Sequence, residues 1–209
     1  MNTKEIILEA KKLADSSNSI EELYDNIRNF DGCLLKKTAT NTVISDGNKY
    51  AKIMIIGEAP GANEDVQGIP FCGDSGKLLD KMLSHIGLSR EENIYITNSI
   101  FWRPPGNRKP TKDEIMICRA FVEKHIYLIN PRLIILAGST AVSSILQIPD
   151  PITKVRNDFY SYNNIYIKDG IKTTAIFHPS YLLRQPSQKK LAWFDLLRIK
   201  RYIDDNDIT

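Results

Sequence analysis

Apolar and polar residues alternate along this chain in a pattern typical of strands followed by helices. Unbroken apolar runs predict core strands at residues 52–56, 94–97, 133–137 and 173–177, and the first is apolar enough to be buried on both faces. Apolar residues at helical spacing predict helices at 3–17, 20–29, 75–86, 111–130, 138–146 and 187–203. Strands that alternate with helices indicate a parallel sheet with right-handed crossovers. We therefore expect an α/β fold, a three-layer α/β/α sandwich around a central, four-stranded, mainly parallel sheet.

Three stretches fall outside this alternation. Residues 1–30 carry two amphipathic helical patterns and are interpreted as an N-terminal helical scaffold. Residues 40–44 form a β-branched run that predicts a short strand, followed by a turn at Asp46-Gly47. Residues 150–171 contain the alternation FYSYNNIYI, which predicts a β-hairpin centred on Asn163-Asn164. We expect residues 1–209 to form a single domain, since the chain shows no internal repeat or low-complexity segment.

The composition is that of an ordinary soluble protein. The 209 residues are 42% hydrophobic and 25% charged, and the net charge of +3 neither demands nor excludes a nucleic-acid partner. No apolar run approaches the roughly 20 residues that span a bilayer, and the N-terminus lacks the features of a signal peptide, so we expect a cytoplasmic protein with no membrane contact. The three cysteines, Cys33, Cys72 and Cys118, are too widely spaced for a disulfide framework and are interpreted as reduced thiols.

Polar side chains stand where three of the predicted core strands end. Glu58 follows Gly57 at the end of the first strand, Asn98 follows the second, and His178 follows the last. Each alone has a plain structural explanation, as a cap, a loop brace or a buried histidine. However, the carboxyl ends of parallel strands meet at one edge of a sheet, where ligands bind. Together with Phe71 from the first loop, these residues predict a single site at that edge.

Common nucleotide and nucleophile motifs do not match this loop. Gly76-Lys77 has neither the glycine spacing nor the following Ser/Thr of a phosphate-binding P-loop, and no Rossmann fingerprint or Gly-x-Ser-x-Gly elbow occurs. Cys72, between Phe71 and Gly73, is more typical of a loop-packing residue than of a nucleophile. A nucleotide-dependent phosphoryl-transfer enzyme is therefore disfavoured.

Three long segments, in this order, resemble the motifs of the uracil-DNA glycosylase superfamily, and specifically its family 4 branch. They read GEAPGANEDVQGIPFCGDSGKLL, TNSIFWRPPGNRKPT and HPSYLLRQP, and the similarity extends from about Cys33 to the C-terminal helix. The resemblance implies a DNA repair glycosylase. Such an enzyme flips uracil out of single- or double-stranded DNA and hydrolyses its N-glycosidic bond, leaving an abasic site. The resemblance also makes a monomer the default expectation.

The resemblance assigns catalytic roles to Glu58 and His178. His178 is expected to donate to the uracil oxygen that gains charge as the base leaves, and Glu58 to orient water or stabilise the cationic sugar. Better-studied family 1 enzymes carry an aspartate at the position of Ala59, so water activation cannot be copied from them. Asp65, on the same loop, is a rival carboxylate for this role, and the choice stays open.

The remaining expected contacts involve the base and the DNA. Phe71 is expected to stack on uracil, and the Asn98 amide to pair with its N3–H and O4, a pattern that cytosine would leave unpaired. Ser180 and Arg184 are expected to contact phosphates, and Leu182 either to wedge into the gap left by the base or to pack internally. The substrate-binding set is Gly57, Ala59, Asp65, Phe71 and Asn98, and the DNA-binding set is Ser180, Leu182 and Arg184.

One departure concerns a cofactor. Family 4 enzymes typically hold an iron-sulfur cluster on four cysteines, whose thiolates are its ligands. Only Cys33 and Cys118 match these positions, whereas Phe30 and Trp102 stand at the other two. We expect no cluster and no metal, with Phe30 and Trp102 filling the space by apolar packing. This loss keeps open an alternative function, a non-catalytic module that binds abasic or damaged DNA.

Overall fold

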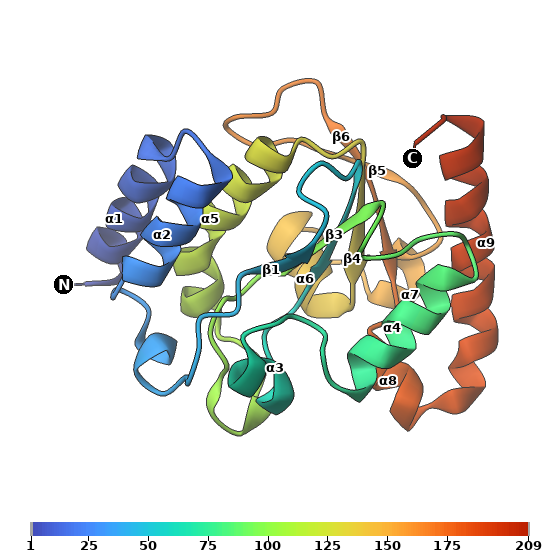
Figure 1. Ribbon diagram of the computed structural model, residues 1–209, viewed down its shortest axis with the longest axis horizontal. Coiled ribbons are helices and arrows are strands. Elements are labelled where there is room, and N and C mark those ends of the chain that lie inside the picture. Colours follow the sequence, from blue (N-terminus) through green and yellow to red (C-terminus); the bar gives the residue numbers. More distant parts are fainter. Residues whose placement is uncertain (1, 209) are drawn as a thin grey trace.

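The protein is described by a computed structural model that covers residues 2–208 (Figure 1). Within these residues the strands form one six-stranded sheet in the order β1-β3-β2-β4-β6-β5. The four central strands are parallel, as predicted, and a short antiparallel strand lies at each edge. The strands are β1 (Ser45–Gly47), β2 (Ile53–Gly57), β3 (Ile94–Asn98), β4 (Leu133–Ala137), β5 (Tyr160–Tyr162) and β6 (Ile171–Ile176).

Helices connect and cover these strands. The α-helices are α1 (Thr3–Ser16), α2 (Ile20–Asn29), α3 (Ala62–Gln67), α4 (Asp74–Ser84), α5 (Lys112–Ile129), α6 (Ser139–Ile145), α7 (Ile152–Val155), α8 (Pro179–Arg184) and α9 (Lys189–Asp205). Short 3-10 turns lie at Leu34–Lys37, Pro105–Asn107 and Pro186–Gln188. None of the helices in residues 2–208 has both the length and the apolarity that a membrane crossing needs.

Side chains on the two faces of the sheet build two separate cores. Met54 and Ile56 of β2 belong to a core with residues from α1, α2, α5 and α6, whereas Ile53 and Ile55 belong to a core with residues from α4 and α9. Figure 1 shows the corresponding layers, with α1, α2 and α5 on one side of the strands and α4 and α9 on the other. All five residues of β2 are buried, because both faces of a parallel sheet are covered. The predicted sandwich is confirmed, with six strands instead of four.

The first edge strand lies later in the chain than predicted. Residues 40–44 do not form a strand, and β1 begins at Ser45, where its residues pair with β3. The backbone N–H groups of Thr40 and Asn41 donate to the carboxylate of Asp65 instead of to a neighbouring strand. The start of this β-branched run is therefore a loop, because a side chain from elsewhere satisfies its first two backbone N–H groups.

The second edge strand pairs differently from the predicted hairpin. β5 pairs with the first residues of β6, so the two arms are 160–162 and 171–173. Residues 163–170 form the connection, in which the side chain of Asn164 accepts hydrogen bonds from the N–H groups of Tyr166 and Ile167. The short helix α7, which follows Pro151, occupies the start of the predicted hairpin.

A buried ion pair supports the segment that leads to His178. Arg156, directly after α7, donates from Nε to Oδ2 of Asp195 on α9 over 2.9 Å, and the two side chains are 8% and 4% exposed. The Arg156 guanidinium also lies 4.8 Å from the ring centroid of Phe177, the residue before His178. The pair thus joins α7 and α9 beneath the end of β6.

Replacing Arg156 by methionine is expected to destabilise the protein strongly, because it leaves the Asp195 carboxylate buried without a partner. We expect a loss of about 3 kcal/mol or more in the free energy of unfolding, measured by urea denaturation. The unfolding free energy should be measured at a pH above the pKa of Asp195, where its carboxylate is charged. Burial raises this pKa to about 6, although the positive charge of Arg156 opposes the shift. The control is Lys154→Met, which breaks the exposed Lys154–Asp150 pair and should change the free energy of unfolding far less. Equal losses in the two variants would contradict this role for Arg156.

Candidate active site

A cavity of about 420 Å³ opens at the carboxyl edge of the sheet, where the sequence predicted a site. The edge is set by strand register: Gly57, the last residue of β2, pairs with Asn98, the last residue of β3. Seven of the predicted residues line this cavity together: Glu58, Ala59, Phe71, Asn98, His178, Ser180 and Arg184. The structure therefore brings the ends of three strands and the first loop together, as expected from the topology.

The Asn98 amide and the Phe71 ring both lie close to Gly57, the last residue of β2. A Cβ atom at Gly57 would lie 2.4 Å from Oδ1 of Asn98 and 2.5 Å from Cζ of Phe71. Contacts this short do not occur, so any side chain at Gly57 would displace both groups. Gly57 therefore shapes the cavity wall by having no side chain.

Phe71 is buried and presents its ring next to His178. The two ring centroids are 5.6 Å apart with an angle of 28° between the planes, a stacked arrangement. The backbone of Phe71 has a φ of 53°, in the left-handed region that residues with side chains seldom adopt. Strained backbone of this kind is found at ligand sites, where surrounding contacts hold it.

The imidazole of His178 has a defined hydrogen-bonding state. His178 caps the N-terminus of α8, and its Nδ1 accepts from the backbone N–H of Ser180 over 3.1 Å. The neutral ring therefore carries its proton on Nε2. Burial, and secondly the positive charge of Arg184, lower the pKa of His178 to about 4. At neutral pH the site thus contains an uncharged histidine with one N–H donor.

The two rival carboxylates lie in different places. Glu58 is half-buried and lines both the first cavity and a second one of about 520 Å³. Asp65, predicted to bind substrate and to compete for the water, is buried outside both cavities, where its Oδ1 accepts from the N–H groups of Thr40 and Asn41. This is a correction: α3 turns Asp65 toward the N-terminal segment, so Glu58 alone of the pair faces the cavity.

Only some of the α8 residues predicted to contact DNA line a cavity. Ser180 and Arg184 line both cavities. Leu182, in contrast, is 0% exposed and packs with Phe177 and Ala192, which agrees with the packing alternative and not with a wedge. The exposed apolar side chain of α8 is Leu183, at 43%.

Sequence reasoning missed three residues that shape the site. The Glu64 carboxylate lines the cavity and accepts from the N–H groups of Gly61 and Gly73, which joins the two ends of the loop. Gly138, with a φ of 97°, leaves room for His178, because a Cβ there would lie 2.9 Å from the histidine Cβ. Gly138 directly follows β4, so the strand-end argument applied to the third strand would have found it. No sequence pattern indicated Arg90, whose side chain donates a hydrogen bond to the backbone carbonyl of Phe71.

The cysteine region does not supply the ligands of an iron-sulfur cluster. Cys33 and Cys118 are fully buried. The neighbouring Cys33 thiol, together with burial, raises the pKa of Cys118, which favours the protonated thiol over the thiolate that a metal needs. Phe30 and Trp102 are buried in the same core, as predicted. Within residues 2–208, no group of three or more His, Cys, Asp or Glu side chains is placed to hold a metal ion, and two thiols do not fit a four-thiolate cluster.

Comparison with known proteins places these features in a family. Residues 44–198 match the model of the uracil DNA glycosylase superfamily. The chain is 37% identical to the type-4 uracil-DNA glycosylase of Saccharolobus solfataricus, over 92% of this chain and 90% of the relative. It is 38% identical to the type-4 uracil-DNA glycosylase of Archaeoglobus fulgidus, over 82% and 87%, and 37% identical to that of Thermotoga maritima, over 88% and 94%. The chain therefore belongs to the uracil DNA glycosylase superfamily.

Proposed function

We propose that this protein is a uracil-DNA glycosylase, a DNA repair enzyme that flips uracil out of DNA and hydrolyses its N-glycosidic bond to leave an abasic site. One observation carries the proposal beyond family membership. The amide of Asn98, the ring of Phe71 and the neutral imidazole of His178 line a single cavity, with Glu58 beside them. This set can read a base edge, stack on a base face and stabilise a departing base.

The proposed recognition depends on Asn98 and Phe71. A carboxamide accepts from uracil N3–H and donates to uracil O4, whereas cytosine presents the opposite pattern and would leave both groups unpaired in a buried site. Asn98 is almost fully buried, so such a mismatch would be costly. The ring of Phe71 supplies a stacking surface for the base, and the missing side chain of Gly57 leaves room for that ring and for the Asn98 amide.

The proposed chemistry breaks the bond between the sugar C1′ and uracil N1. The bonding electrons leave with the base, which becomes an anion, while the sugar gains positive charge. The Nε2–H of His178 donates to the uracil oxygen that gains charge, and the carboxylate of Glu58 orients the water or stabilises the cationic sugar. The water oxygen bonds to C1′, and its proton balances the charge of the released uracil.

The proposed DNA path follows the second cavity, which runs from Glu58 and His178 toward Lys109, Ser139 and Thr153. Arg184 is the candidate phosphate contact, whereas the N–H of Ser180 is already used to fix the tautomer of His178. Leu183 presents an exposed apolar side chain from the same helix.

We also propose that the enzyme acts without a cluster or other metal, as a cytoplasmic monomer. Its preference for single- or double-stranded DNA is measured in the excision experiment described next.

The first prediction concerns activity. Purified protein incubated with a uracil-containing oligonucleotide, single- or double-stranded, and then treated with alkali should yield strand cleavage. His178→Ala and Asn98→Ala should each lower the excision rate by roughly 100-fold or more, because each removes a group that acts on the leaving base. Circular dichroism and urea denaturation check that both variants remain folded.

The control for that experiment is Leu8→Ala, whose exposed side chain on α1 lies outside both cavity linings, and it should leave single-turnover excision at the wild-type rate. A wild-type protein that retards the oligonucleotide on a gel but never cleaves it would favour the DNA-binding module instead. Excision at the wild-type rate by His178→Ala would contradict the assigned role of the imidazole.

The second prediction concerns the charge of His178. Its pKa is lowered to about 4, so the neutral form is held above that value and is lost only as the pH falls through it. An NMR titration, with the resonance assigned through His178→Ala, should therefore show protonation well below the ordinary value of about 6.5. Arg184→Gln should move the midpoint upward, because it removes a nearby positive charge. A midpoint at the ordinary value would contradict the buried, neutral imidazole.

The third prediction concerns iron. Protein purified without oxygen should contain far less than one iron per chain and show no visible absorbance, because only two of the four thiolates are present. Adding iron and sulfide under reducing conditions should leave excision unchanged. Stoichiometric iron that survives gel filtration would overturn this proposal.

A further inference from the structure

The backbone of Phe71 needs support, because it holds a residue with a large side chain in the left-handed region, at a φ of 53°. Part of that support comes from Gly76 on α4. A Cβ at Gly76 would lie 1.6 Å from the carbonyl oxygen of Phe71, so the helix backbone closes one side of this peptide. The carbonyl must then find its hydrogen bond on the remaining side.

Arg90 supplies that hydrogen bond. Its Nη2 donates to the carbonyl oxygen of Phe71 over 2.6 Å, and its Nη1 donates to the carbonyl oxygen of Pro70 over 2.8 Å. The planar guanidinium thus bonds two consecutive carbonyls at the point where the backbone is strained. A lysine ammonium has no such fork.

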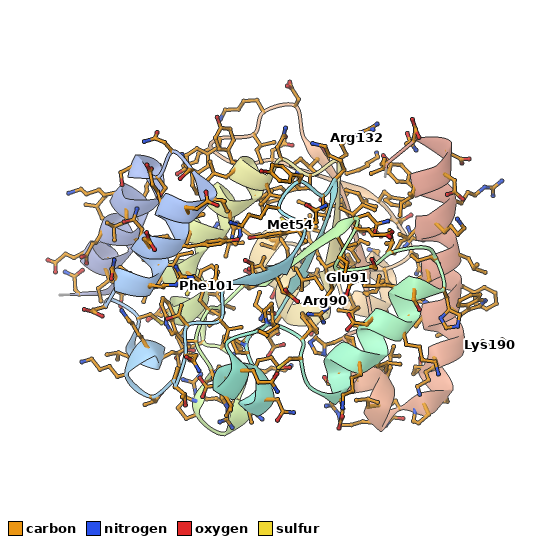
Figure 2. The ribbon with its side chains drawn as sticks, viewed as in Figure 1. Met54, Arg90, Glu91, Phe101, Arg132 and Lys190 are labelled. Carbon is orange, nitrogen blue, oxygen red and sulfur yellow. The ribbon has the colours of Figure 1, made fainter. Side chains whose placement is uncertain are left out.

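The other side of Arg90 is anchored by two carboxylates. Nε donates to Asp80 on α4 over 2.8 Å, and Nη1 donates to Asp46 on β1 over 2.9 Å. The Arg90 side chain is only 14% exposed. Figure 2 shows Arg90 near the centre of the molecule, between the strands and α4. Its position is therefore fixed independently of the loop that it holds.

We propose that Arg90 is the positioning residue for the base-stacking ring: by bonding the carbonyls of Pro70 and Phe71 it holds the Phe71 ring against the cavity, next to His178. This role rests on the proposed glycosylase function. Arg90 lines neither cavity and acts through Phe71. Small displacements of groups that position a substrate lower rates by up to about 100-fold, so a loosened ring should slow excision without any loss of catalytic groups.

The test compares two variants that remove opposite halves of this arrangement. Arg90→Lys keeps a positive charge near Asp46 and Asp80 but loses the paired carbonyl bonds, and should lower kcat/KM for uracil excision by roughly 10- to 100-fold. Asp80→Asn removes one anchoring charge but leaves both carbonyl bonds, and should stay within about twofold of wild type. Urea denaturation of each variant separates loss of activity from loss of folded protein. A normal kcat/KM in folded Arg90→Lys would overturn the proposal.

A double-mutant cycle with Phe71→Ala tests whether Arg90 acts through the ring. If it does, Arg90→Lys should change kcat/KM by no more than about twofold once the ring is absent, so the two effects are far from additive. Additive losses would mean that Arg90 supports the site by another route, and would overturn the proposal even if both variants are slow.

An NMR measurement makes the result independent of activity. The Phe71 ring stacks on His178 at 5.6 Å, so it should shift the imidazole proton resonances. In Arg90→Lys these resonances should move toward their positions in Phe71→Ala, and in Asp80→Asn they should stay near wild type. Unchanged resonances in Arg90→Lys would overturn the proposal. If wild-type protein fails to excise uracil, the proposed function fails, and the NMR comparison still decides whether Arg90 positions the ring.

Discussion

The absence of a side chain at Gly57 is the constraint on which this site depends. β2 and β3 run parallel and in register, so their last residues, Gly57 and Asn98, lie side by side. The Asn98 oxygen and the Phe71 ring both occupy space that a Cβ at Gly57 would need. The Asn98 amide is then placed by the sheet itself, and a sheet buried on both faces is among the least deformable parts of a protein.

The long loop after β2 is held by residues with no chemical role of their own. Glu64 joins Gly61 to Gly73 by accepting a backbone N–H from each. Arg90 bonds the carbonyls at its centre, and Gly76 closes against them. The loop is therefore restrained at its start, middle and end before any DNA is present. Preorganisation of this kind lowers the ordering cost of binding, so more of the contact energy is expressed as affinity and orientation.

Sequence alone predicted the core of this protein because its signals are strong and mutually consistent. Long apolar runs identified the four central strands, and the parallel topology then brought Glu58, Asn98 and His178 to one edge. Short elements were missed, because six residues of α3 or α8 carry little periodicity and form through tertiary contacts.

For the same reason two choices between similar residues could not be made from the sequence. Which of two nearby carboxylates faces the cavity depends on the orientation of α3, and which of two neighbouring leucines is exposed depends on the rotation of α8.

The region around the two buried cysteines also affects the site. Trp102 lies four residues after Asn98, is fully buried and donates from Nε1 to Thr42 over 3.0 Å. Burying such a ring contributes on the order of 4–6 kcal/mol as an upper bound. With only two thiols at this junction, apolar packing around Trp102 and Phe30 holds the chain as it leaves Asn98, so the position of the Asn98 amide depends on hydrophobic burial.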